Sequence, residues 1–138
     1  MGTMLRFFMD ASHSPNSVAL LDLEQLHMLL EAGASDSFGL LREILDLYEE
    51  ESRVKLGELQ AGLDSGDHAS MGRAAHALAG SSANIGGRAV WQQAKELEDS
   101  CKNGQGPDMP AKVQSLEEVY WRTLDELKAF LARAESGN

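Results

Sequence analysis

Proline is absent between residues 16 and 106, and this absence constrains the fold more than any other feature of the sequence. Proline breaks helices because it lacks a backbone N–H and clashes with the preceding turn, so this stretch is free to form long helices. Val, Ile and Thr, which favour strands, number only nine, whereas Leu and Ala together number 37. Hydrophobic residues make up 43% of the chain, which is enough for a buried core. The sequence therefore predicts an all-α protein.

Five segments carry apolar or small residues at spacings of three and four, which places these residues on one face of a helix. Aspartates precede four of the segments as N-caps, and glycines follow most of them as stops. The predicted helices span about residues 22–32, 37–65, 68–85, 88–102 and 109–135. Four long amphipathic helices joined by short loops pack most economically as an antiparallel four-helix bundle. The short first helix is an additional N-terminal helix that covers one end or side.

Residues 20–135 are expected to form this one domain, after a flexible N-terminal lead-in over residues 1–19. The net charge of −10 argues against nucleic acid as a partner, because phosphate binding needs a basic face. No apolar run approaches the roughly 18 residues of a membrane span. The single cysteine, Cys101, precludes an internal disulfide and suits a reducing cytoplasm. We expect a monomeric, cytoplasmic protein that binds neither nucleic acid nor membrane.

The predicted helix over residues 68–85 carries His76 on its outward side. At about 100° per residue, His76 lies about 160° from Leu78, the centre of the apolar face. Long polar residues are usual on exposed helix faces, but here the neighbours are Gly72, Arg73, Ala79, Gly80 and Ala83. Each glycine costs a helix about 1 kcal/mol relative to alanine, which suggests room kept for a molecule approaching the imidazole. The alternative is that the glycines let a neighbouring helix pack closely and that His76 is an ordinary surface residue.

Residues 76–86, which read His-Ala-Leu-Ala-Gly-Ser-Ser-Ala-Asn-Ile-Gly, resemble the signature of histidine-containing phosphotransfer (HPt) domains. In that signature the phospho-accepting histidine is followed by x-Leu-Lys-Gly-Ser-Ser, a small-polar pair, an aliphatic residue and glycine. The likeness extends to Leu21-Asp22, to the Leu-rich and acidic second helix, and to Leu97-Glu98 late in the fourth helix. It covers about residues 20–132.

The resemblance implies that Nε2 of His76 accepts and donates a phosphoryl group. The partners it implies are response-regulator receiver domains and a hybrid sensor histidine kinase of a two-component phosphorelay. The receiver would bring Mg²⁺ and most of the charge stabilisation, so we expect no cofactor and no metal site in this chain. Such a chain is a phosphoryl carrier, not an autonomous enzyme.

Two other functional classes stay open. The first is a receiver-binding adaptor of HPt fold with weak or no phosphotransfer. The second is an unrelated metal-binding bundle, suggested by the Glu-x-x-His motif at residues 24–27. Di-iron bundles need a second copy of that motif, and the sequence has none, which disfavours this class.

Ala79 departs from the signature, because the family usually has lysine three residues after the histidine. The resemblance implies that this lysine steadies the phosphoryl group, and its absence favours the adaptor. Arg73, about 60° round the helix from His76, is one candidate substitute, and Lys95 on the fourth helix is another. Because Ala79 is expected to be exposed, Ala79→Lys is predicted to be tolerated and to speed transfer.

Leu40, Leu47 and Val54 repeat every seven residues on the side of the second helix opposite its apolar stripe. An apolar row on the outside of a protein needs a cover or a partner. We expect the first helix, or the apolar segment around Phe7 and Phe8, to pack on it. Docking of the receiver and self-association are the alternatives.

Overall fold

The computed structural model describes residues 19–104 and 108–137, and all regular structure in these ranges is helical. The elements are α2 (Leu23–Ala32), the 3₁₀ turn η1 (Ala34–Asp36), α3 (Ser37–Ser65), α4 (His68–Ile85), α5 (Arg88–Asn103) and α6 (Met109–Glu135). The all-α prediction is confirmed, and the predicted helix bounds agree with these to within one residue. The η1 turn was not predicted. Residues 1–18, including Phe7 and Phe8, lie outside the described residues.

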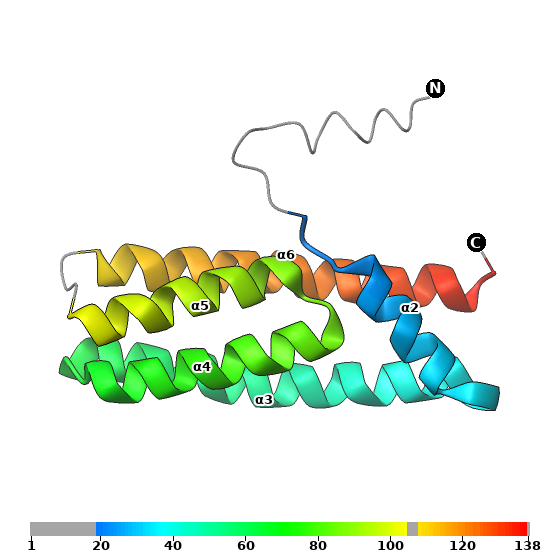
Figure 1. Cartoon of the computed structure of the whole chain (residues 1–138), viewed down its shortest axis with the longest axis horizontal. Coiled ribbons are helices and arrows are strands. Elements are labelled where there is room, and N and C mark those ends of the chain that lie inside the picture. Colours follow the sequence, from blue (N-terminus) through cyan, green and yellow to red (C-terminus); the bar gives the residue numbers. More distant parts are fainter. Residues whose placement is uncertain (1–18, 105–107, 138) are drawn as a thin grey trace, which may run out of the picture.

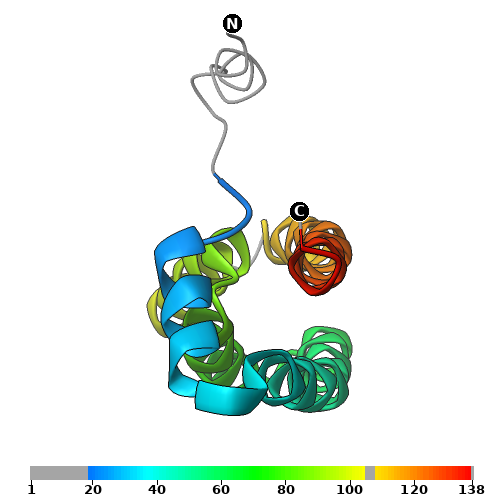
Figure 2. The same cartoon turned by 90° about the vertical axis from the view of Figure 1, so that its right-hand side faces the viewer.

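Helices α3 to α6 form the predicted antiparallel four-helix bundle and run side by side along its length (Figure 1). Consecutive helices of the bundle contact each other, and α6 closes the ring against α3. The additional helix α2 lies across one end of the bundle (Figure 2), where it packs on α3 and α4. The core between the four helices is mostly Leu and Ala, as the composition predicted.

Caps and glycine turns set the helix ends. The side chains of Asp22, Asp36 and Asp67 each accept a hydrogen bond from a backbone N–H three residues on, at 3.1–3.2 Å. Asp108 was predicted to cap α6, but its side chain makes no such bond. At the end of α4, Gly86 adopts a left-handed φ of 84°, so the chain reverses at once and α5 returns along α4. This tight turn is what brings the faces of α4 and α5 together.

Gly33 ends α2 as predicted, but for a different reason from the usual one. Its φ is −74°, and the left-handed residue is its neighbour Ala34, at φ 53°. A Cβ on Gly33 would lie 2.6 Å from the Cα of Ser37, which is closer than atoms can approach. Glycine is therefore required here by the close passage of the chain into α3, and not by its own backbone angle.

A polar layer crosses the core and fastens α4 to α3. The Tyr48 hydroxyl and the Ser82 hydroxyl are hydrogen-bonded at 2.7 Å, and both residues are almost fully buried. Nearby, Ser52 bonds the hydroxyl of Tyr120 on α6 at 2.6 Å. Burial raises the pKa of Tyr48 well above its usual range, so its hydroxyl stays protonated. Ser82 belongs to the stretch over residues 76–86 that resembles the HPt signature. In this fold its hydrogen bond fixes the axial position and rotation of α4 against α3.

We predict that Tyr48→Phe lowers the free energy of unfolding by about 1–3 kcal/mol, because it leaves the buried Ser82 hydroxyl without a partner. The double variant Tyr48→Phe/Ser82→Ala removes both groups, so it is expected to lose less than the two single variants together. Urea unfolding followed by circular dichroism measures all three. Strictly additive losses would mean that the two hydroxyls are not coupled.

Candidate functional site

His76 lies on α4 with 73% of its side chain exposed, and its ring faces a carboxylate of α5. Its Nδ1 is 2.9 Å from Oε2 of Glu98, whose own side chain is only 10% exposed. A carboxylate can only accept hydrogen bonds, so Nδ1 carries the proton and donates it. In the neutral ring the lone pair is then on Nε2, on the far side of the ring from Glu98. The arrangement presents one unprotonated imidazole nitrogen to solvent.

Glu98 reaches this place because it is a charged residue on the buried stripe of α5. It lies beside Leu97 and one turn from Ala94 and Cys101, all of which are in the core. The residue was predicted only as part of the HPt resemblance and not as a partner of His76. The signal was available, since a carboxylate on a helix's apolar stripe needs a hydrogen-bond partner from the helix that covers it.

Glu98 has an incomplete set of partners. Its Oε2 lies 2.9 Å from His76 and 3.7 Å from Nζ of Lys102. Its Oε1 is buried and has no hydrogen-bond partner among the residues that the structure describes. These groups line an open groove between α4 and α5, together with other residues: His68, Ala69, Gly72, Arg73 and Cys101.

The predicted outer strip is only partly at the surface. His76, Arg73, Gly80 and Ala83 are exposed and Gly72 is half-buried, but Ala79 is 3% exposed, so its predicted exposure was wrong. The reason is that α4 packs against both α3 and α5, and its buried arc is wider than one amphipathic stripe. The prediction that Ala79→Lys is tolerated was based on this exposure, so the reason for it does not hold.

The two glycines of the strip differ in what surrounds them. A Cβ on Gly72 would lie 3.5 Å from the Cβ of Cys101, so Gly72 is in ordinary contact range of α5. A Cβ on Gly80 would meet no atom of the described residues within 4 Å. Close helix packing, the alternative explanation of the glycines, therefore cannot account for Gly80.

The two predicted cations lie in different places. Arg73 lines the groove beside His76 and forms no ion pair among residues 19–104 and 108–137. Lys95 is exposed on α5 but does not line the groove. Helices α4 and α5 are antiparallel, and Glu98 contacts His76. Lys95, three residues before Glu98, therefore lies opposite Ala79, which is about one turn along α4 from His76.

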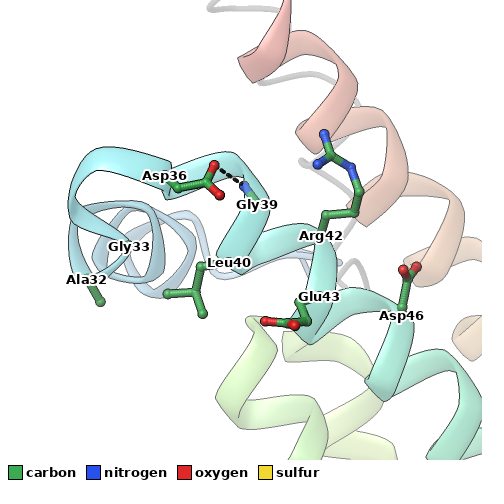
Figure 3. Close-up of a pocket in the computed structure, with 8 residues that line it drawn as sticks. All are labelled: Ala32, Gly33, Asp36, Gly39, Leu40, Arg42, Glu43 and Asp46. Carbon is green, nitrogen blue, oxygen red and sulfur yellow. Dashed lines mark hydrogen bonds between the residues drawn. The ribbon is translucent and has the colours of Figure 1, made fainter.

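The apolar row on α3 is not covered by α2. Leu47 and Val54 are 53% and 56% exposed, which contradicts the predicted cover by the first helix. Only Leu40 is half-buried, and it lines a pocket where α2 meets α3 (Figure 3). In this pocket Arg42 turns away toward α6, where it pairs with Glu135. The short α2 crosses the end of the bundle and so does not reach along the outer face of α3.

Cys101 lines the groove but is largely buried. Burial raises the pKa of its thiol, and the charge of Glu98 raises this pKa further. The thiolate is the reactive form, so Cys101 acts as an apolar wall of the groove and not as a nucleophile at neutral pH.

Metal ligands and membrane-spanning helices are two other features that would bear on function. Residues 19–104 and 108–137 contain no group of three or more His, Cys, Asp or Glu side chains placed to hold a metal ion. No helix in the same ranges has both the length and the apolar character that crossing a membrane requires.

The family model of the Hpt domain matches residues 43–137, which is more than half of the chain and includes α4 and α5 in full. No curated protein is similar enough to count as a match. Among solved structures, the crystal structure of histidine-containing phosphotransfer protein B (HptB) from Pseudomonas aeruginosa PAO1 is similar, with 27% identity and a TM-score of 0.75. The alignment covers 85% of this chain and 98% of that one.

Two plant structures share the fold at lower identity. A putative histidine-containing phosphotransfer protein from rice is 17% identical with a TM-score of 0.74, covering 99% of this chain and 100% of that one. The histidine-containing phosphotransfer protein ZmHP2 from maize is 20% identical with a TM-score of 0.73, covering 98% of this chain and 97% of that one.

Proposed function

Because the chain belongs to the Hpt domain family, we propose that it carries a phosphoryl group on His76 between response-regulator receiver domains of a two-component phosphorelay. The observation that carries this proposal is the hydrogen bond from Nδ1 of His76 to the buried Glu98. It orients a largely exposed ring and leaves Nε2 as the nucleophile. A hybrid sensor histidine kinase is the proposed source of the phosphoryl group.

The transfer step follows from this arrangement. The lone pair of Nε2 attacks the phosphorus of the receiver's aspartyl phosphate. An N–P bond forms while the bond from phosphorus to the aspartate oxygen breaks, and the aspartate leaves as a carboxylate with the electron pair. The ring is left with a proton on Nδ1 and a positive charge, which the adjacent Glu98 carboxylate stabilises. The reverse sequence returns the phosphoryl group.

The receiver is the proposed source of Mg²⁺ and of most transition-state stabilisation, so the chain acts as a carrier and not as an enzyme in its own right. Gly80 and Ala83, with Gly72 at the edge of the groove, leave room for the receiver to close over His76. Arg73, which lines the same groove and has no ion-pair partner in the part of the chain that the structure describes, is the proposed cation for the phosphoryl oxygens. Lys95 lies outside the groove and is not assigned this role. We further propose a cytoplasmic monomer that binds neither nucleic acid nor membrane.

The alternative is a receiver-binding adaptor with weak or no transfer. It is favoured by one observation, the uncharged Ala79 at the position where the resemblance implies a lysine. The two functions share a docking surface and differ in whether the phosphoryl group moves.

The deciding experiment incubates the chain with receiver domains of its own organism that have been phosphorylated with acetyl phosphate and Mg²⁺. Label that moves to the chain and is labile to acid but stable to alkali supports the carrier, because an N–P bond behaves in this way. Binding of a receiver without label supports the adaptor. Neither binding nor label from any receiver would contradict both.

We predict that Glu98→Ala slows phosphoryl transfer by about tenfold, because the ring loses the acceptor that orients it and stabilises its charge. Glu98→Gln retains an acceptor but no charge, so an intermediate rate is expected. Stopped-flow or rapid-quench transfer from a phosphorylated receiver measures both rates. Glu96→Ala, an exposed carboxylate on the same helix, is the control and should transfer at the wild-type rate.

A further inference from the structure

Lys102 shares the carboxylate of Glu98 with His76. Its Nζ lies 3.7 Å from Oε2, the same oxygen that accepts the hydrogen bond from Nδ1. The lysine side chain is 69% exposed, whereas Glu98 is almost fully enclosed. The ammonium group therefore lies beside the carboxylate oxygen that orients His76, at the end of a long, flexible side chain.

Phosphorylation changes the charges in this groove. A phosphoryl group on Nε2 brings about two negative charges to a site that already contains a buried carboxylate. The phosphoryl group and the Glu98 carboxylate repel each other, and the repulsion is stronger because Glu98 is shielded from water. Ala79 offers no charge, and the cations that line the groove are Arg73 from α4 and Lys102 from α5. A contact between either cation and the phosphoryl oxygens would offset this repulsion.

We propose that Lys102 is a catalytic cation of the transfer reaction, in addition to Arg73. In the free protein it pairs with Glu98; when the phosphoryl group arrives, its ammonium turns from Oε2 of Glu98 to the phosphoryl oxygens. The step is the one described above, in which the N–P bond forms and the aspartyl P–O bond breaks, with Mg²⁺ on the receiver. This inference rests on the proposed function of His76.

Lys95 provides a matched control for Lys102. Both are exposed lysines of α5, and seven residues separate them, so they lie on nearly the same face of the helix with Glu98 between them. Only Lys102 contacts Glu98 and lines the groove. A general effect of removing positive charge from α5 would be the same in both variants.

The experiment compares transfer from a phosphorylated receiver at saturating concentration in the full chain and in Lys102→Ala, Lys102→Arg and Lys95→Ala. We expect Lys102→Ala to lower the maximal transfer rate about fivefold, which corresponds to loss of one charge-assisted contact. Lys102→Arg should recover most of the rate, and Lys95→Ala should match the wild type. Thermal unfolding of each variant checks that the fold is intact, as expected for exposed side chains.

Each outcome separates this inference from the proposed function. If the wild-type chain takes up no acid-labile label, the carrier function is wrong and the role of Lys102 falls with it. If the wild type is labelled and Lys102→Ala is as fast as the wild type, or no slower than Lys95→Ala, the carrier stands and Lys102 is not catalytic. A Lys102-specific loss that arginine restores supports the inference.

Discussion

Replacing His76 by glutamine is expected to reduce acid-labile labelling from a phosphorylated receiver to background. Glutamine is similar in length and polarity, but its amide nitrogen has no lone pair available for attack on phosphorus. The side chain is mostly exposed, and its one hydrogen bond is to Glu98, which an amide N–H can also donate to. The fold should therefore survive the change while the reaction does not. Label is measured by Phos-tag electrophoresis or by ³¹P NMR of the intact protein.

His68→Gln is the matched control for this prediction. His68 lines the same groove, eight residues earlier on α4, and is the other histidine within reach of a ligand there. It has no carboxylate partner among residues 19–104 and 108–137, so neither of its ring nitrogens is selected as a nucleophile. His68→Gln should keep full labelling. If label survives in His76→Gln and disappears in His68→Gln, the phosphorylated residue is His68, at the N-terminal end of α4, and not His76.

The sequence predicted the helices well because their ends are local events. An aspartate that accepts a backbone N–H three residues on and a glycine with a left-handed φ act within one turn, so Asp67 and Gly86 can be identified without knowing the fold. The exposure of His76 was also predictable, because helical periodicity places it opposite the core residue Leu78. Both inferences need only the geometry of a single helix.

The features that periodicity could not supply depend on how neighbouring helices pack. Ala79 is buried because two helices flank α4, and the angle around one helix does not say how much of its surface they cover. The pairing of His76 with Glu98, and of Glu98 with Lys102, depends on the register of α4 against α5. That register is set by the short turn at Gly86, which joins the two helices. The register of α4 against α5 can therefore be determined only from the packed helices.

The same reasoning explains why the sequence could not decide whether the first helix covers the row on α3. Helical periodicity along α3 correctly placed Leu47 and Val54 outside the core. Their apolar character led to the expectation that another segment packs on them. Whether α2 provides that cover depends on its direction after Gly33, where the close approach to Ser37 steers the chain across the bundle end. A short helix that crosses an end cannot also run along a side.

Gly80→Gln is expected to slow phosphoryl transfer by about tenfold or more while it stabilises the protein. A Cβ at this position meets no atom of residues 19–104 and 108–137 within 4 Å, so packing within the bundle does not require a glycine here. Replacing a glycine inside a helix should raise the free energy of unfolding by about 0.5–1 kcal/mol. Gly80 lies one turn from His76 on the exposed side of α4, where a partner must approach closely. A side chain that costs docking about 1.4 kcal/mol lowers receiver affinity tenfold.

Gly57→Gln distinguishes this steric effect from a general effect of helix stabilisation. Gly57 is also an exposed glycine inside a long helix, α3, and a Cβ there likewise meets no atom within 4 Å in the described part of the chain. Both variants should unfold at higher urea concentration than the wild type. Only Gly80→Gln should need a higher receiver concentration for half-maximal transfer. If both variants transfer at the wild-type rate, the bare surface beside His76 is not where the receiver docks, and the approach of the phosphoryl donor must come from the Arg73 side of the groove.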